Sequence, residues 1–362
     1  MPRSGLRCFT CRTEFGHGLY PAGCPSCGEA LEVVYEYSGE LERPGAPGLW
    51  RYAPMLPVED EGFHLSLGEG NTPLVRWGSL YLKNETANPT WSFKDRFHAV
   101  SLAMARTLGY RKVVASTTGN HGVAAAAYAA RAGMKCVIFC HRESSPLQRR
   151  MIGLYGALPV VLEPRQAMLE TLVRDHGYWP STTMAPLPVA NAYGVEGYKT
   201  IAYEIWRDLG RVPDHMVCPV AAGDALYGPW KGFCELRQLG LTDRVPTMHA
   251  AQPAGCNPMV QSFRARLDHV IVHPQPSSIA LSIRDETGGW PALKAIYDSG
   301  GSAIDATEQE IIQATLQLAA AGLLVEPASA TAVACALQAG FPAGQTVVCL
   351  LTGSGAKWTE TL

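Results

Sequence analysis

The fold is decided by two short stretches, Ser92-Phe-Lys-Asp-Arg96 and Ser116-Thr-Thr-Gly-Asn-His-Gly122. The first places a lysine just after a Pro-Thr turn. The second follows a strand-like run, 112–115, and precedes an alanine-rich, helix-like run, 120–132. A glycine-containing loop at that position presents main-chain N–H groups at a helix N-terminus, where they can hold an anion. An ordinary turn with a helix cap is the alternative interpretation of this loop.

Strand-like and helix-like segments alternate along the rest of the chain. Further strands are predicted at 135–140, 158–162, 215–220 and 345–351, and helices at 146–156, 195–209, 226–239 and 327–339. Short buried strands separated by helices favour parallel sheets, and parallel sheets place their functional groups at the strands' C-terminal ends. The sequence therefore predicts an α/β protein.

Length, charge and hydropathy limit the classes of function. The chain has 362 residues, of which 47% are hydrophobic, so it can bury more than one core. Its 30 basic and 32 acidic residues form no blocks, which argues against nucleic acid as a partner. The sequence contains no stretch of about 18 uncharged apolar residues, so no membrane span is expected. The first residues do not resemble a secretory signal. Together with the scattered cysteines, these features predict a cytoplasmic protein.

Four of the 11 cysteines have the spacing of metal ligands. Cys8-x-x-Cys11 and Cys24-x-x-Cys27 are typical of a zinc ribbon, in which four thiolates close a tetrahedral shell. A closed shell leaves no position for catalysis, so the expected zinc is structural. The alternatives are four free buried cysteines or a ribbon that no longer binds metal, and nucleic-acid binding by the ribbon is a weaker second role.

Two later loops have the same strand-to-turn character. Pro219-Val-Ala-Ala-Gly-Asp-Ala-Leu-Tyr-Gly228 precedes a helix and is a candidate phosphate-binding turn, and Leu350-Leu-Thr-Gly-Ser-Gly355 places a hydroxyl at a strand end. Taken together and in order, these loops resemble those of the fold-type-II pyridoxal-phosphate (PLP) enzymes, most closely the threonine synthase group. The resemblance covers about 68–357 and includes the motifs Gly68-Glu-Gly-Asn-Thr-Pro-Leu-Val75, Glu196-Gly-Tyr-Lys-Thr-Ile-Ala-Tyr-Glu-Ile205, Trp230-Lys-Gly-Phe233 and Glu326-Pro-Ala-Ser-Ala330.

The resemblance implies two parallel-sheet, three-layer domains behind the small ribbon. The expected boundaries are 1–38 for the zinc ribbon, 39–98 with 195–362 for the large PLP-binding domain, and 99–194 for a small mobile domain. It also implies a small amino-acid substrate and a homodimer.

The resemblance assigns a role to each loop. Lys94 would hold PLP covalently and then act as the base at the substrate Cα. Asn120 would hydrogen-bond the ring oxygen of the cofactor, and Thr352 would face its pyridine nitrogen. The remaining site residues would bind substrate carboxylate through the main chain at Ser116, Thr117, Thr118 and His121, and PLP phosphate at Ala221, Ala222, Gly223, Asp224 and Ala225.

Several positions depart from the threonine synthase pattern. Trp91 and Phe97 stand where that group has glycines beside the lysine motif, and Gly194 stands where it has an arginine that helps to hold the substrate phosphate. Trp91 could narrow the substrate space, and packing beneath the turn is the favoured interpretation. Asp224 adds a carboxylate beside the expected phosphate. His121 replaces a threonine and is more typical of the dehydratase, racemase and ammonia-lyase relatives.

These observations predict a PLP-dependent lyase that eliminates or replaces a β or γ substituent of a small amino acid. One alternative is a true threonine synthase, which converts O-phosphohomoserine to threonine and phosphate. A second alternative, from another class, is a catalytically silent homologue that binds a partner.

Overall fold

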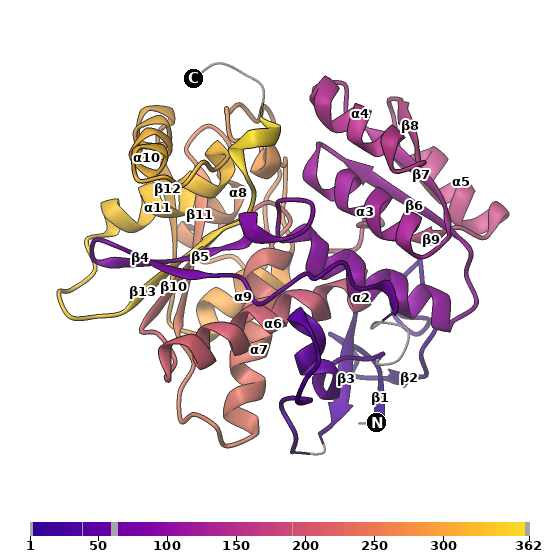
Figure 1. Cartoon of the computed structure of the whole chain (residues 1–362), viewed down its shortest axis with the longest axis horizontal. Helices are drawn as coiled ribbons and strands as arrows, with labels where there is room; N and C mark the ends of the chain where they lie inside the picture. The colour runs from indigo at the N-terminus through magenta and orange to yellow at the C-terminus, as the bar shows by residue number, and fades with distance from the viewer. Residues whose placement is uncertain (1–2, 38, 59–63, 190, 359–362) are drawn as a thin grey trace. The chain divides into compact units, whose positions relative to one another are not determined.

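The computed structural model describes residues 3–37, 39–58, 64–189 and 191–358, and these form two compact units (Figure 1). Unit 1 comprises residues 1–71 and 94–198, and unit 2 comprises residues 72–93 and 199–362. The chain therefore leaves unit 1 for a short segment that ends at Phe93, and Lys94 is the first residue after its return. No helix in the described ranges is long and apolar enough to cross a membrane.

Unit 1 is built on a four-stranded sheet whose strands are all parallel. The sheet order is β8-β7-β6-β9, with bounds Leu158–Val161, Lys135–Cys140, Lys112–Thr117 and Trp179–Pro180. Successive residues of a strand point to opposite faces. Accordingly Val113 belongs to one hydrophobic cluster and Val114 to another. The sheet is thus covered on both faces, as parallel sheets require.

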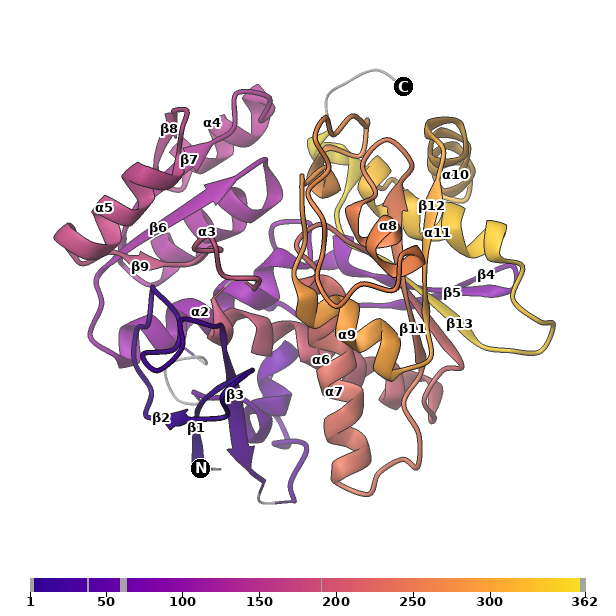
Figure 2. The ribbon, with the colours of Figure 1, turned by 180° about the vertical axis from the view of Figure 1, so that it is seen from behind.

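Four helices complete this part of unit 1, namely α2 (Lys94–Thr107), α3 (Asn120–Arg131), α4 (Pro146–Leu154) and α5 (Gln166–His176). Helices α2 and α3 share the cluster that contains Val113 and Ala115, whereas Leu169 of α5 packs in the cluster that contains Val114. Figure 2 shows the same sheet and helices from behind.

The first part of unit 1 is a three-stranded antiparallel ribbon. Its strand order is β2-β1-β3, formed by Glu14–Phe15, Arg3–Cys8 and Leu31–Glu36. Leu6, Leu31 and Val33 lie in the same hydrophobic cluster as α2 and α3. The ribbon therefore supplements a shared core, although so short a segment could bury little apolar surface alone. The 3-10 helix η1 (Gly48–Met55) follows the ribbon.

Unit 2 is built on a six-stranded sheet of order β12-β11-β10-β13-β5-β4. The strands are Ser302–Ala306, Thr247–Pro253, His215–Pro219, Val347–Leu351, Leu80–Asn84 and Leu74–Trp77. All neighbours are parallel except β4, which pairs antiparallel with β5 at the edge. The helices of this unit are α7 (Asp224–Gln238), α8 (Pro258–Arg264), α9 (Trp290–Asp298), α10 (Glu308–Ala320) and α11 (Pro327–Ala339), with short 3-10 turns η2 (Glu85–Ala87), η3 (Leu281–Ile283) and η4 (Gly355–Lys357).

The predicted α/β class with parallel sheets is confirmed. Helix α6 (Ala192–Leu209) begins three residues earlier than the sequence suggested and runs from unit 1 into unit 2. The compact units place residues 39–71 in unit 1, together with the ribbon. The expected boundaries of the large PLP-binding domain, 39–98 with 195–362, and of the small mobile domain, 99–194, stay a prediction.

Candidate active site

Lys94 is the first residue of α2, and the first turn of this helix is packed against α6. A Cβ atom on Gly197 of α6 would overlap the main-chain oxygen of Arg96, so this close approach requires glycine. The next residue, Tyr198, is fully buried, and Lys94 Nζ lies 5.6 Å from the centroid of its ring. The lysine thus stands beside an aromatic surface that α6 provides.

Phe97, one helical turn after Lys94, packs against the position of Gly194. A Cβ atom at Gly194 would lie 2.5 Å from both Cδ2 and Cζ of the Phe97 ring. Real Cβ atoms do not approach other atoms so closely, because close-packed interiors tolerate no such overlap. Phe97 is fully buried, and its ring centroid also lies 5.6 Å from that of Tyr198. The two departures from the threonine synthase pattern, at 97 and at 194, are therefore one coupled packing arrangement.

The loop that precedes α3 is ordered by the Thr117 side chain. Thr117 Oγ1 accepts hydrogen bonds from the N–H groups of Gly119 at 2.8 Å and Gly122 at 2.9 Å. A side chain on Gly122 would overlap Thr117 Cγ2, which explains the second glycine of the loop. Because Gly119 N–H already has a partner, an anion at this helix N-terminus would use the neighbouring N–H groups, as at Thr118 and His121.

Two imidazoles lie next to one another beside this lysine. The ring centroids of His98 and His121 are 4.4 Å apart, and His121 Nε2 donates to the main-chain oxygen of Ser181 at 2.7 Å. Burial and the Lys94 charge lower the pKa of His121 to about 3. Burial, followed by His121 and Lys94, also holds the pKa of His98 well below its usual range, although the nearby main chain of His121 opposes this shift. Both rings are therefore neutral at neutral pH.

The candidate phosphate-binding turn lies in unit 2, between β10 and α7. Gly223 precedes α7 with φ 112°, and a Cβ atom there would lie 2.5 Å from the Cβ atom of Ala292. Only glycine fits both constraints, and the helix N-terminus leaves main-chain N–H groups for an anion. Asp224 is buried as the first residue of α7, where the helix dipole stabilises a carboxylate.

Thr352 lies in unit 2 directly after β13, and its contacts define the surroundings of the residues before Lys94. Its main-chain oxygen accepts from Phe93 N–H at 2.9 Å, and its Oγ1 lies 3.1 Å from Ser329 Oγ. Ser92 forms an isolated bridge with Gly353. Ser92 Oγ is buried and forms no hydrogen bond with any described residue. A buried hydroxyl without a partner costs about 1–3 kcal/mol, so it suits a position that a ligand completes.

Trp91 does not pack beneath the turn, so the interpretation favoured from the sequence was wrong. Its side chain is 46% exposed, and its φ of 62° lies in the left-handed region that favours glycine. The main chain is held on both sides, because Trp91 N–H donates to Asn88 and Trp91 O accepts from Ser354. These bonds retain a strained residue three positions before the lysine.

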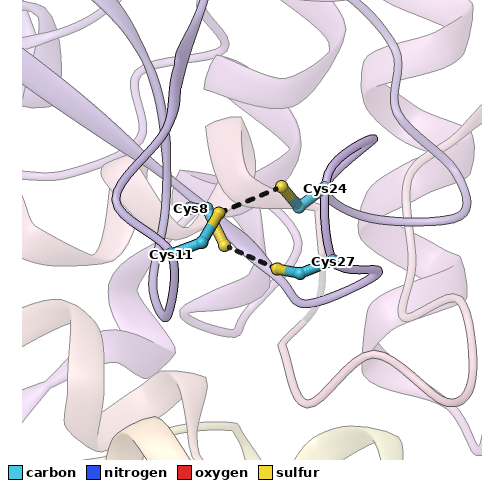
Figure 3. A group of neighbouring side chains, drawn as sticks. All are labelled: Cys8, Cys11, Cys24 and Cys27. Atoms are coloured by element: carbon cyan, nitrogen blue, oxygen red, sulfur yellow. Dashed lines mark hydrogen bonds between the residues drawn. The ribbon is translucent and has the colours of Figure 1, made fainter.

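The four ribbon cysteines come together as the spacing predicts. Their Sγ atoms all lie within 4.8 Å of one another, and Figure 3 shows the four thiols directed toward a common point. Cys8 Sγ lies 3.5 Å from Cys27 Sγ, and Cys11 Sγ lies 3.6 Å from Cys24 Sγ. Four sulfur ligands at such separations fit tetrahedral zinc. Hydrogen bonds with Thr13 lower the pKa of Cys11 to about 6, which favours the thiolate form.

The sequence-predicted residues fall into two groups. Lys94, Asn120, His121 and the loop 116–118 belong to unit 1, whereas 221–225 and Thr352 belong to unit 2. Sequence reasoning missed His98, Ser181 and Tyr198. His98 follows Lys94 by four residues on a helix, a spacing that shares one face, so helical periodicity would have found it.

An α/β fold with parallel sheets, a lysine at a helix start and glycine-bearing turns after strands are the features expected of a PLP-dependent enzyme of this class. Residues 65–353 match the family model described as pyridoxal-phosphate dependent enzyme, and the chain belongs to this family. The threonine synthase of Methanocaldococcus jannaschii is 35% identical over 97% of this chain and 92% of its own. That of Methanosarcina acetivorans is 33% identical over 99% and 93%. The chain is thus a lyase-type member of the threonine synthase-like group.

A solved structure supports the same fold. Maize serine racemase superposes with a TM-score of 0.68 at 20% sequence identity, covering 78% of this chain and 88% of that one. The residues described above fit PLP, because the turn at Gly223 admits no side chain and the buried Ser92 hydroxyl awaits a partner.

Proposed function

We propose that this enzyme eliminates or replaces a β or γ substituent of a small amino acid whose side chain carries no phosphate, with Lys94 as the lysine that holds the cofactor. The observation that carries this proposal is the packing of Phe97 against Gly194, within a turn of Lys94. That packing leaves no room for a side chain at 194, and an arginine there is the usual ligand of a substrate phosphate in the resembling group.

Two buried lysines, Lys83 and Lys199, are poor candidates for the cofactor lysine because each forms an ion pair. Lys83 Nζ lies 2.7 Å from Glu204 Oε2, and Lys199 Nζ lies 3.0 Å from Glu235 Oε1. Breaking a buried pair leaves an uncompensated charge, which is strongly unfavourable. Lys94 Nζ faces the Tyr198 ring at the start of α2, at the position that the motif Ser92-Phe-Lys-Asp-Arg96 gives to the cofactor lysine of the resembling group.

These positions support a separate role for each residue of the site. Bound PLP supplies an electron sink for the carbanion that forms at the substrate Cα. Lys94 would take the Cα proton, and the main chain at Thr118 and His121 would hold the substrate carboxylate. Asn120, Thr352 and the turn 221–225 would hold the cofactor ring and phosphate. A hydroxyl rather than a carboxylate at position 352 is the donor expected when the pyridine nitrogen stays less protonated, which suits elimination and replacement. We also propose one structural zinc at Cys8, Cys11, Cys24 and Cys27.

The test of the cofactor lysine is chemical labelling. Borohydride reduction of the holoenzyme followed by peptide mapping should place the label on Lys94, and Lys94→Ala should lose both the visible cofactor absorbance and turnover. A label on Lys83 or Lys199 would overturn this assignment. A homologue that binds no PLP would lack the absorbance from the start, which separates the silent alternative from an enzyme.

The test of the substrate class is a screen with purified holoenzyme. Serine, threonine and 2,3-diaminopropionate are assayed for ammonia and keto acid, and O-phosphohomoserine for phosphate and threonine. We expect turnover of the first group. The threonine synthase alternative is favoured by the 33–36% identity of the curated relatives, and efficient threonine formation would establish it instead.

A further inference from the structure

Ser181 orients both imidazoles that lie beside Lys94. Its main-chain oxygen accepts from His121 Nε2 at 2.7 Å, and its Oγ lies 2.9 Å from His98 Nδ1. Ser181 follows the short strand β9 of the same sheet that carries the loop before His121. One residue thus fixes two rings that are 60 and 83 positions away in the chain.

The hydrogen-bond partners determine where each ring carries its hydrogen. A carbonyl oxygen only accepts, so Nε2 of His121 is the donor and Nδ1 keeps its lone pair while the ring is neutral. His121 is only partly buried, and among the described residues its side chain has one hydrogen bond, through Nε2, which leaves Nδ1 without one. This nitrogen is therefore an acceptor without a partner among the described residues, in a residue that keeps some exposed surface.

The hydrogen on His98 follows from a chain of bonds that begins at an obligate donor. Trp179 Nε1 donates to Ser101 Oγ at 3.0 Å, and Ser101 Oγ lies 3.0 Å from Ser181 Oγ. If each hydroxyl passes on its single hydrogen, Ser181 donates to His98 Nδ1 and His98 carries its hydrogen on Nε2. The whole group is buried except at His121, so its orientation is rigid.

The rings of Phe97, His98 and Tyr198 form an aromatic wall beside His121, and burial, followed by the charge of Lys94, lowers the pKa of His121. The Phe97 ring centroid lies 5.2 Å from that of His121, 5.0 Å from that of His98 and 5.6 Å from that of Tyr198. Lys94 Nζ lies beside the same aromatic rings, at 5.6 Å from the centroid of the Tyr198 ring. A phosphate monoester is mostly the dianion at neutral pH, so its oxygens and the Nδ1 lone pair repel each other.

We propose that His121 Nδ1 accepts a hydrogen bond from the side chain of the bound amino acid, so that the wall selects a hydroxyl or amine substituent and disfavours a phosphorylated one. This inference rests on the proposed function, because it names the substituent that the lyase acts on. His121 is then a specificity-determining residue, and Ser181 is the residue that positions it and its neighbour His98.

The experiment compares the binding of L-serine with that of L-alanine, which lacks the donor, by titrating the cofactor absorbance of the holoenzyme. We expect the wild type to bind serine more tightly, and His121→Leu to lower the serine-to-alanine affinity ratio about tenfold, the loss expected for one hydrogen bond. His121→Gln is the matched control, because its amide can donate to Ser181 and still present an acceptor, so it should retain most of the ratio.

The outcomes separate this inference from the proposed function. An unchanged ratio in His121→Leu would overturn the role of Nδ1, even where serine is turned over. A wild type that forms threonine from O-phosphohomoserine and turns over no hydroxyl or amine substrate would instead refute the proposed function. Ser181→Ala keeps the main-chain bond to His121 but frees His98, so it should change the ratio less than His121→Leu does. A larger effect of Ser181→Ala would assign the selectivity to His98 and overturn the proposal.

Discussion

The ring of Phe97 occupies the space in which a side chain at position 194 would begin. The two residues lie on α2 and α6, and the overlap with a Cβ atom would involve the ring atoms Cδ2 and Cζ at 2.5 Å. A glycine near the start of a helix is otherwise unfavourable by about 1 kcal/mol relative to alanine. The glycine at position 194 is therefore explained by the space that the Phe97 ring occupies, and not by helix propensity.

We expect Gly194→Ala to have opposite effects in two backgrounds. In the wild type it should destabilise the protein by about 1–3 kcal/mol, because the added methyl group overpacks the Phe97 ring. In Phe97→Ala the same change should stabilise by about 1 kcal/mol, because helix propensity then dominates. Thermal unfolding of the four proteins in this double-mutant cycle measures the coupling. Additive effects would show that the two positions do not share the space.

Trp91 provides a second test of local strain. Trp91→Gly should be more stable than Trp91→Ala by about 1–2 kcal/mol, because only glycine adopts its φ of 62° without steric cost. Both variants remove the same half-exposed ring, so the alanine variant is the matched control. Equal melting temperatures would indicate that this turn relaxes to another conformation.

Zinc removal should loosen the ribbon without releasing PLP. The four thiols lie in one segment, and the candidate cofactor residues lie elsewhere in the chain. Freshly purified protein should contain one zinc per chain, and chelation should lower the unfolding temperature while the visible absorbance stays. Cys8→Ser should lose the metal, whereas Cys234→Ser, outside the cluster, should retain it. Protein purified without any zinc would contradict the site.

The ribbon also contacts the start of α6, so zinc loss should affect substrate binding. Tyr193 OH donates to Gly18 O at 3.0 Å, and Tyr35 OH donates to Glu196 Oε2 at 2.7 Å. These contacts flank Gly194. We therefore expect the KM for substrate to rise on chelation, with a smaller change in kcat.

The pH dependence of stability should include His249 in unit 2. Burial, assisted by His215, lowers its pKa from 6.5 to about 4. His249 Nε2 lies 3.0 Å from His215 Nδ1, and its Nδ1 lies 2.7 Å from Ser302 Oγ. A folded-state pKa below the unfolded value gives stability that is present above pH 6.5 and is lost as the pH falls toward 4.

Over that interval His249 should contribute a slope of at most about 1.4 kcal/mol per pH unit to the free energy of unfolding. His249→Gln retains hydrogen-bonding groups but does not titrate, so urea unfolding of this variant between pH 7 and 4 should show a shallower slope. His98 and His121, which are also neutral in the folded state, would still contribute the remainder. An identical slope in the variant would exclude His249 as a contributor.

The sequence predicted the parts of the fold and site that depend on local patterns. Strand and helix periodicity located β6, α3 and β7, and glycine-bearing turns located the loops at 116–122 and 221–225. The placement of side chains was harder to predict from the sequence, because it depends on packing between distant segments. The departures at Phe97 and Gly194 were each visible, but their overlap emerges only when α2 and α6 lie together. Ser181 carried no local signal, because its partners are 60 and 83 residues away.

O-phosphohomoserine should be a poor substrate of the wild-type enzyme. An arginine–phosphate pair provides two charge-assisted hydrogen bonds in one plane, each contributing about 1.5–3 kcal/mol. Without that arginine, catalytic efficiency should be lower by about a hundredfold or more than that of an enzyme that has it. Arg149 and Arg150 are the cations on α4 that could replace it, and Arg150 is exposed whereas Arg149 is only partly buried.

Restoring the arginine requires a change at both positions of the coupled pair. We expect Phe97→Ala with Gly194→Arg to raise kcat/KM for O-phosphohomoserine by at least about tenfold, since even one charge-assisted bond corresponds to that factor. Gly194→Arg alone should not fold stably, because the Phe97 ring blocks the side chain, and Phe97→Ala alone should gain nothing. The measurement is steady-state release of phosphate and threonine, with ammonia release from serine as the parallel control. Efficient threonine formation by the wild type, on the order of 10⁴ M⁻¹s⁻¹, would refute the argument, and loss of that activity in Arg149→Ala would then identify the replacement cation.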